Sequence, residues 1–200
     1  MQEITIIVYS IDELTGEAKK RAVEKVQTIL HETFEPSFLT EHFKELLKEK
    51  GLPGLSVYWS LSYCQGDGVA FYGKVDIDAL LACEACKPIW PELRYLQSLD
   101  FGHEIEITGV NSRYYHHNSM KVTTHYPGFG LDKSLYKVED LIEERRAAVY
   151  FFLDRYIKGI SKELEKVGYA EIEYQTSEEM ALEYATELQF TKDGTIFNHF

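Results

Sequence analysis

The sequence predicts an α+β fold, in which an antiparallel sheet built from two hairpins packs against several helices. Two pairs of short runs rich in β-branched and aromatic residues predict the hairpins, at 55–63 with 69–77 and at 103–109 with 120–125. Longer segments with apolar residues three or four positions apart predict the helices. The segments do not alternate regularly between strand and helix, so an antiparallel sheet beside helices is favoured over a parallel one.

The first part of the chain predicts a short strand and two amphipathic helices. The run 4–9 is rich in β-type residues, and Ser10 with Glu13 has the spacing of a capping box. A helix is therefore expected from that box to about residue 31. A second helix is expected over about 37–50, and Gly51 with the following turn ends it.

The rest of the chain predicts further helices around the second hairpin. A short helix is expected over 77–86, and the longest helix over about 139–167, with Gly168 just beyond its end. A capping-box pattern beginning at Thr176 predicts a helix to about residue 188. The run 190–197 carries Asp-Gly at its centre and predicts a small hairpin.

Length and charge favour one acidic globular domain over 1–200. The net charge of −12 argues against direct nucleic-acid binding, which needs clustered Lys and Arg. It suits solubility, a basic protein partner or mimicry of nucleic acid, and the spread of the acidic residues favours a solvated surface over mimicry. No apolar run approaches the roughly 20 residues that span a bilayer. The first residues carry no basic segment of a signal peptide, and three cysteines cannot all pair, so a reduced, cytoplasmic protein is expected.

The sequence Gln-Gly-Asp-Gly at 65–68 is the first candidate site. Asp-Gly between two β-type runs is a strong hairpin signal, and glycine lets a ligand or another backbone approach closely. Asp67 could bind a cation, orient a tyrosine hydroxyl or act as a base, and Gln65 could recognise an amide or a base edge. The alternative is a tight turn in which Asp67 bonds to its own backbone.

The second candidate is the run 111–118, which is dense in side chains that bond, stack or titrate. If it connects strands that neighbour the first hairpin, it lies beside the Gln-Gly-Asp-Gly turn. His116 or His117 could then meet Asp67 for acid–base work or for metal binding. The alternative is a polar aromatic rim at the end of a hairpin. The candidate binding residues are Gln65, Gly66, Asp67, Gly68, Arg113, Tyr114, Tyr115 and His116.

Cys83 and Cys86 have the CxxC spacing of zinc and redox sites. A structural zinc site needs two further ligands, and no second CxxC is present. The two cysteines also fall three apart on a predicted apolar helix, which favours packing in the core. The chain lacks GxSxG, HExxH, P-loop and dinucleotide-binding motifs.

Four motifs in order resemble a family of small proteins of tailed bacteriophages and prophages. They are the segment 9–22, the stretch 59–71 with Cys-Gln-Gly-Asp-Gly, the Tyr-His run 113–120, and Phe-Thr-Lys-Asp-Gly at 190–194. The family motif most often has serine where this chain has Cys64, which argues against a role for that thiol. The resemblance implies phage origin, one domain and an accessory role against host machinery, such as inhibition of a CRISPR effector or capture of a signalling nucleotide.

Together these observations favour a non-enzymatic binding protein that works in the bacterial host cytoplasm and antagonises a defence component. Its partner is expected to be a host protein or a small ligand, and the sequence specifies no cofactor. The alternative is a metal-assisted hydrolase or nucleotide-modifying enzyme that uses Asp67 with His116 or His117. A third hypothesis makes both motifs purely structural.

Overall fold

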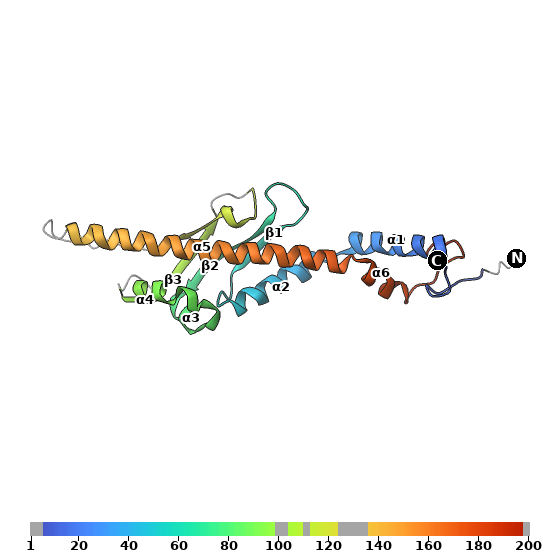
Figure 1. The fold of residues 1–200 in the computed structure, drawn as a ribbon, viewed down its shortest axis with the longest axis horizontal. Helices are drawn as coiled ribbons and strands as arrows, with labels where there is room; N and C mark the ends of the chain where they lie inside the picture. The colour runs from blue at the N-terminus through green and yellow to red at the C-terminus, as the bar shows by residue number, and fades with distance from the viewer. Residues whose placement is uncertain (1–5, 99–103, 110–112, 124–135, 198–200) are drawn as a thin grey trace. The chain divides into compact units, whose positions relative to one another are not determined.

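A computed structural model describes residues 6–98, 104–109, 113–123 and 136–197 (Figure 1). The described elements are, in chain order, α1 (Gly16–Thr33), α2 (Pro36–Glu49), β1 (Ser56–Ser60), β2 (Gly68–Asp76), α3 (Ile77–Ala82), the 3-10 helix η1 (Glu84–Ile89), α4 (Trp90–Ser98), β3 (Glu104–Gly109), the 3-10 helix η2 (His117–Ser119), β4 (Met120–Thr123), α5 (Tyr136–Gln175) and α6 (Glu178–Ala185). They fall into two compact units, unit 1 (Met1–Pro36 and Tyr169–Phe200) and unit 2 (Ser37–Gly168). The single domain over 1–200 stays a prediction.

The sheet of unit 2 confirms the predicted α+β fold with two antiparallel hairpins. Its described strands lie in the order β1-β2-β3-β4, and each pairs antiparallel with its neighbour. In the first hairpin Tyr58 pairs with Ala70, and in the second Ile107 pairs with Val122. The long strand β2 joins the hairpins, because Gly73 near its end pairs with Ile107.

The core of unit 2 lies between one face of this sheet and the helices α2 and α5. Val69, Ala70 and Phe71 of β2 are all completely buried, so both faces of this part of the strand are covered. The Ser161 hydroxyl of α5 donates to the Val69 carbonyl, and Trp59 Nε1 of β1 donates to Thr40 Oγ1 of α2 at 3.0 Å. Figure 1 shows α5 running across the sheet. Helices α2 and α5 contribute the buried residues Leu39, Phe43, Leu47, Val149, Leu153, Ile157, Ile160 and Leu164.

Unit 1 is built from α1, α6 and the end of the chain. Its core consists of Ile11, Leu14, Ala22, Val23, Val26, Ala181, Ala185 and Phe190. The predicted strand 4–9 is seen only as a bridge between Tyr9 and Phe190, and its first two residues lie outside the described ones. The terminal hairpin forms, with Phe190 bridged to Ile196.

Two predicted helix starts are corrected. Glu13 accepts from the Ser10 amide at 2.8 Å as a capping box requires, yet α1 begins only at Gly16. The positive φ of +56° at Gly16 separates this first turn from the helix. For α6 the capping residue is Ser177, whose hydroxyl accepts from the Met180 amide at 3.2 Å, and not Thr176.

The longest helix was predicted correctly in place but not in length. Helix α5 runs through Gly168 to Gln175, so the prediction that Gly168 follows the helix end is wrong. Gly168 instead provides room for neighbours, because a Cβ there would lie 2.5 Å from Leu61 Cδ1 and 2.7 Å from Phe43 Cζ. Neither α5 nor any other helix among the described residues has an apolar stretch that could cross a bilayer.

Candidate functional site

The structure brings the Gln-Gly-Asp-Gly turn and the Tyr-His run together at one end of the sheet. A Cβ at Gly66 would overlap the Tyr114 ring, with Cε1 2.8 Å away. A Cβ at Gly68 would lie 2.9 Å from both the Tyr115 carbonyl oxygen and His116 Cβ. Both glycines also have positive φ, of +94° and +148°. Only glycine therefore fits here, and the close approach predicted from the sequence is confirmed. We call residues 58, 62–68 and 113–117 the tip.

Asp67 holds the turn together. One carboxylate oxygen accepts from the Ser60 hydroxyl at 2.8 Å, and the other accepts from the backbone amides of Ser62 and Cys64 at 2.6 and 2.8 Å. The Asp67 amide donates to the Cys64 carbonyl at 3.2 Å. These hydrogen bonds to the carboxylate fix the loop. This arrangement is the self-bonded turn that the sequence left open as an alternative.

The tip presents aromatic side chains to solvent. Tyr63 is 69% exposed, Tyr58 44% and Tyr114 40%. Tyr58 stacks on Tyr115 with ring centroids 5.7 Å apart, and Tyr114 stacks on His116 at 6.1 Å. Tyr63 has a φ of +57°, an uncommon conformation for a residue with a Cβ. Sequence reasoning missed Tyr58 and Tyr63, although alternation along β1 already places Tyr58 on the face opposite the core-facing Trp59.

The two histidines have different surroundings. His116 Nδ1 accepts from the Asn118 amide at 3.0 Å, and this bond orients the ring. Burial lowers the pKa of His117, as do the charges of Lys162, His116 and Lys158. His117 Nδ1 is buried without a hydrogen-bond partner in the described part of the chain. A working pair between Asp67 and either histidine stays a prediction.

The remaining predicted residues of the tip are on its surface. Gln65 and Arg113 are exposed, and so is Cys64. Within the described ranges, no group of three or more His, Cys, Asp or Glu side chains could hold a metal ion.

Cys83 and Cys86 lie elsewhere in unit 2, and the predicted helix 77–86 that was to hold both is wrong. Helix α3 ends at Ala82, and Cys83 adopts an extended conformation before η1 begins. Cys86 is buried, as the core-packing interpretation expected, whereas Cys83 is half-buried. Both thiols face the end of α2.

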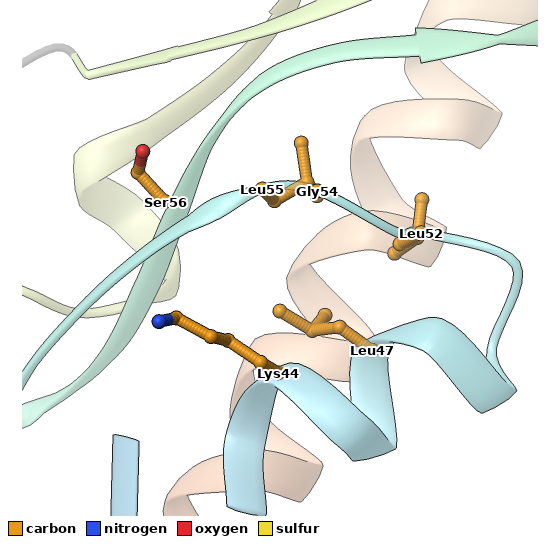
Figure 2. Close-up of a pocket in the computed structure, with 6 residues that line it drawn as sticks. All are labelled: Lys44, Leu47, Leu52, Gly54, Leu55 and Ser56. Atoms are coloured by element: carbon orange, nitrogen blue, oxygen red, sulfur yellow. The ribbon is translucent and has the colours of Figure 1, made fainter. Parts of the chain in front are cut away.

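A cavity of about 370 Å³ lies between the end of α2 and the start of β1 (Figure 2). Its lining is mainly apolar, and Lys44 and Ser56 supply the polar groups. The Lys44 ammonium pairs with Glu41 at 2.7 Å. The residues that line this cavity are Lys44, Leu47, Leu52, Gly54, Leu55 and Ser56, so no predicted site residue belongs to it.

Comparison of the chain with protein-family models, with curated proteins and with solved structures finds no match.

Proposed function

We propose that this chain is a non-enzymatic binding protein of phage origin that antagonises a bacterial defence component by docking its tip on a partner protein. The observation that carries the proposal is the loop 62–68, which Asp67 fixes internally while Tyr63, Tyr58 and Tyr114 remain exposed. The phage origin and the defence target rest on the resemblance of the four sequence motifs.

Exposed tyrosines on a fixed loop suit protein recognition. A tyrosine buries a large apolar ring with few rotatable bonds and keeps a hydroxyl for hydrogen bonding. Tyrosines are enriched among the residues that dominate binding energy at protein interfaces. The stacking of Tyr58 on Tyr115 and of Tyr114 on His116 limits ring motion before binding, which lowers the entropy lost on association.

The bonds of Asp67 favour binding over acid–base catalysis. A general base must accept a proton from its substrate, but this carboxylate already accepts from one hydroxyl and two amides of its own loop. Protonating Asp67 would weaken those bonds. The residue therefore suits a structural role that presents its neighbours.

The net charge of −12 favours a basic partner. Attraction between opposite charges speeds association at low salt and is screened at high salt. We expect the association rate constant to fall by about tenfold or more between 50 and 300 mM salt. A rate constant that is unchanged over this range would contradict a basic partner.

The test compares matched tyrosine variants in cells and in solution. The protein is expressed in bacteria that carry a defence system, and phage plating is measured together with quantitative capture of the defence components. Tyr63→Ala and Tyr114→Ala should each lower capture about 30-fold, as expected for dominant interface residues. Tyr184→Ala removes a tyrosine that is 42% exposed on α6, in unit 1, and should leave plating and capture unchanged.

Two results would overturn the proposal. Equal capture by the wild type, Tyr63→Ala and Tyr114→Ala would show that the tip is not the binding surface. The enzyme alternative would be favoured if the wild type turned over a nucleotide and if His116→Gln or His117→Gln no longer restored phage plating while still capturing the partner.

A further inference from the structure

The C-terminus of α2 is capped partly by thiols. The carbonyls of the last turn need donors, and backbone amides provide several of them: Lys50 donates to Leu46 and Leu47, Gly51 donates to Lys48 at 3.0 Å and Leu52 donates to Leu47 at 2.8 Å. Gly51, with a φ of +76°, makes this a Schellman ending. The next two carbonyls accept from sulfur, since Cys83 Sγ donates to Glu49 at 3.6 Å and Cys86 Sγ donates to Lys50 at 3.2 Å.

The two thiols are also placed to react with each other. A Cβ at Gly51 would lie 3.0 Å from Cys83 Sγ and 3.1 Å from Cys86 Sγ, so both sulfur atoms flank the same point. The Cys86 amide donates to the Cys83 carbonyl at 3.0 Å, which closes a turn. The ends of such a turn lie within about 7 Å, which overlaps the roughly 4.4–6.8 Å between the Cα atoms of a disulfide.

We propose that Cys83 and Cys86 form a reversible redox site, whose free thiols cap α2 and whose oxidation by a small disulfide removes the cap. This site lies apart from the tip and does not depend on the proposed function. The disulfide product carries no S–H group, so the carbonyls of Glu49 and Lys50 lose both donors. The dithiol state therefore stabilises the end of α2, and the disulfide state loosens it.

The reaction is ordinary thiol–disulfide exchange. The half-buried Cys83, as thiolate, attacks the small disulfide, forms a mixed disulfide and releases one thiolate. The Cys86 thiolate then attacks the Cys83 sulfur and releases the second. Two protein thiols are oxidised, one small disulfide is reduced to two thiols, and the protons of Cys83 and Cys86 pass to the released thiolates. Burial raises the pKa of Cys86 to about 11, so the second step should accelerate as the pH rises.

The test uses the full chain in a Cys64→Ser background, which leaves only these two cysteines. After incubation with oxidised glutathione, mass spectrometry should show a loss of about 2 Da and no retained glutathione. Hydrogen exchange should then become about fivefold faster or more at the amides of Gly51 and Leu52, the factor that corresponds to one net hydrogen bond. Dithiothreitol should restore slow exchange.

Two further variants separate capping from mere packing. Cys83→Ser with Cys86→Ser keeps hydroxyl donors but cannot be oxidised, so its exchange should stay slow with or without glutathione. Cys83→Ala with Cys86→Ala has no donors, so its exchange should be fast in both buffers. The proposal is overturned if glutathione leaves both thiols free, or if the disulfide and the alanine variant exchange as slowly as the reduced protein.

Discussion

The chain contains two Asp-Gly turns, one in each unit, and they differ in what surrounds them. Asp193 of unit 1 accepts from the hydroxyls of Thr191 and Thr195, and its backbone carbonyl accepts from Arg21 of α1 at 3.2 Å. A Cβ at Gly194 would overlap the backbone of Ala18 in α1, with the carbonyl carbon 2.9 Å away. This turn is fixed against a helix.

The turn at Asp67 is fixed mainly by its own bonds and packs against the segment 114–116 rather than against a helix. A Cβ at Gly68 would lie 2.9 Å from the Tyr115 carbonyl oxygen, and a Cβ at the preceding Gly66 would overlap the Tyr114 ring. Tyr63 and Tyr114 remain exposed beside the turn. The same dipeptide therefore serves to hold unit 1 together in one case and to present a surface in the other. The difference is carried by the residues beside the turn, not by Asp-Gly itself.

The largest expected effect comes from replacing one glycine in each turn, Gly194 in unit 1 and Gly66 of the Gln-Gly-Asp-Gly turn in unit 2. Gly194→Ala adds left-handed strain and overlaps a helix backbone that cannot move alone, so the free energy of unfolding should fall by about 3 kcal/mol or more. Gly66→Ala carries similar strain but displaces a side chain, so about 1–2 kcal/mol is expected together with loss of partner capture. Urea denaturation measures both.

Gly159→Ala is the control for these glycine variants. Gly159 lies within α5 with open space around it, so alanine should stabilise the protein by roughly 0.5–1 kcal/mol. If Gly194→Ala destabilises no more than Gly66→Ala, the contrast between a structural turn and a presenting turn is wrong.

Removing the carboxylate of Asp67 is expected to have an effect between those of Gly194→Ala and Gly66→Ala, and removing that of Asp193 a smaller one. Asp67→Ala deletes the acceptor of three hydrogen bonds and should lower the free energy of unfolding by about 2–4 kcal/mol. Asp193 is exposed, so Asp193→Ala should lower the melting temperature less. Thermal melts followed by circular dichroism measure both. Equal melting temperatures for the two variants would show that Asp67 is not the main support of its loop.

The smallest expected effect is a dependence of stability on mild acid. Because the pKa of His117 is lowered in the folded protein, the unfolded chain binds the proton more readily. The contribution of His117 to the free energy of unfolding should be fully present above the unfolded pKa of about 6.5. It should be lost as the pH falls from there to the folded pKa. In His117→Gln the urea midpoint should depend less on pH in this range. In His31→Gln, a change at an exposed position of α1, the dependence should stay as in the wild type.

The turn at Asp193 should respond only at stronger acid. Hydrogen bonds from Thr191 and Thr195 lower the pKa of Asp193, so its contribution is present above the unfolded carboxyl value. That contribution is lost as the pH falls through the folded pKa. Asp193→Asn should remove this acidic part of the profile and leave the part above pH 5 unchanged. If Asp193→Asn also changed stability in the mild-acid range, the assignment of that range to His117 would be wrong.

Local patterns predicted the sheet and its hairpins because β-type runs and Asp-Gly turns act over a few residues. They also placed Gly51 after α2, where the helix ends. Gly168 was misread because its role is set by Leu61 and Phe43, which are far away in the sequence. The split between Cys83 and Cys86 was missed for a similar reason, since the two thiols bond to the carbonyls of Glu49, the last residue of α2, and of Lys50 just beyond it.

The meeting of the two motifs at the tip could be predicted because each lies at the end of a strand in the same sheet. The exposed Tyr63 could not, since a left-handed conformation at a tyrosine contradicts the local preference of that residue. The bonds of Asp67 were foreseen only as an alternative, because an Asp-Gly pair is equally suited to a ligand site and to a self-bonded turn.

The strained backbone of Tyr63 allows its function to be tested by laboratory selection. Replacing Tyr63 with glycine should relieve about 1 kcal/mol of strain, so a library selected for thermal stability alone should drift toward glycine or asparagine at this position. A library selected for protection of a phage should keep the aromatic ring despite that cost. The two selections would therefore give different residues at position 63. The difference would show that the tyrosine side chain is kept for protection of the phage and not for stability.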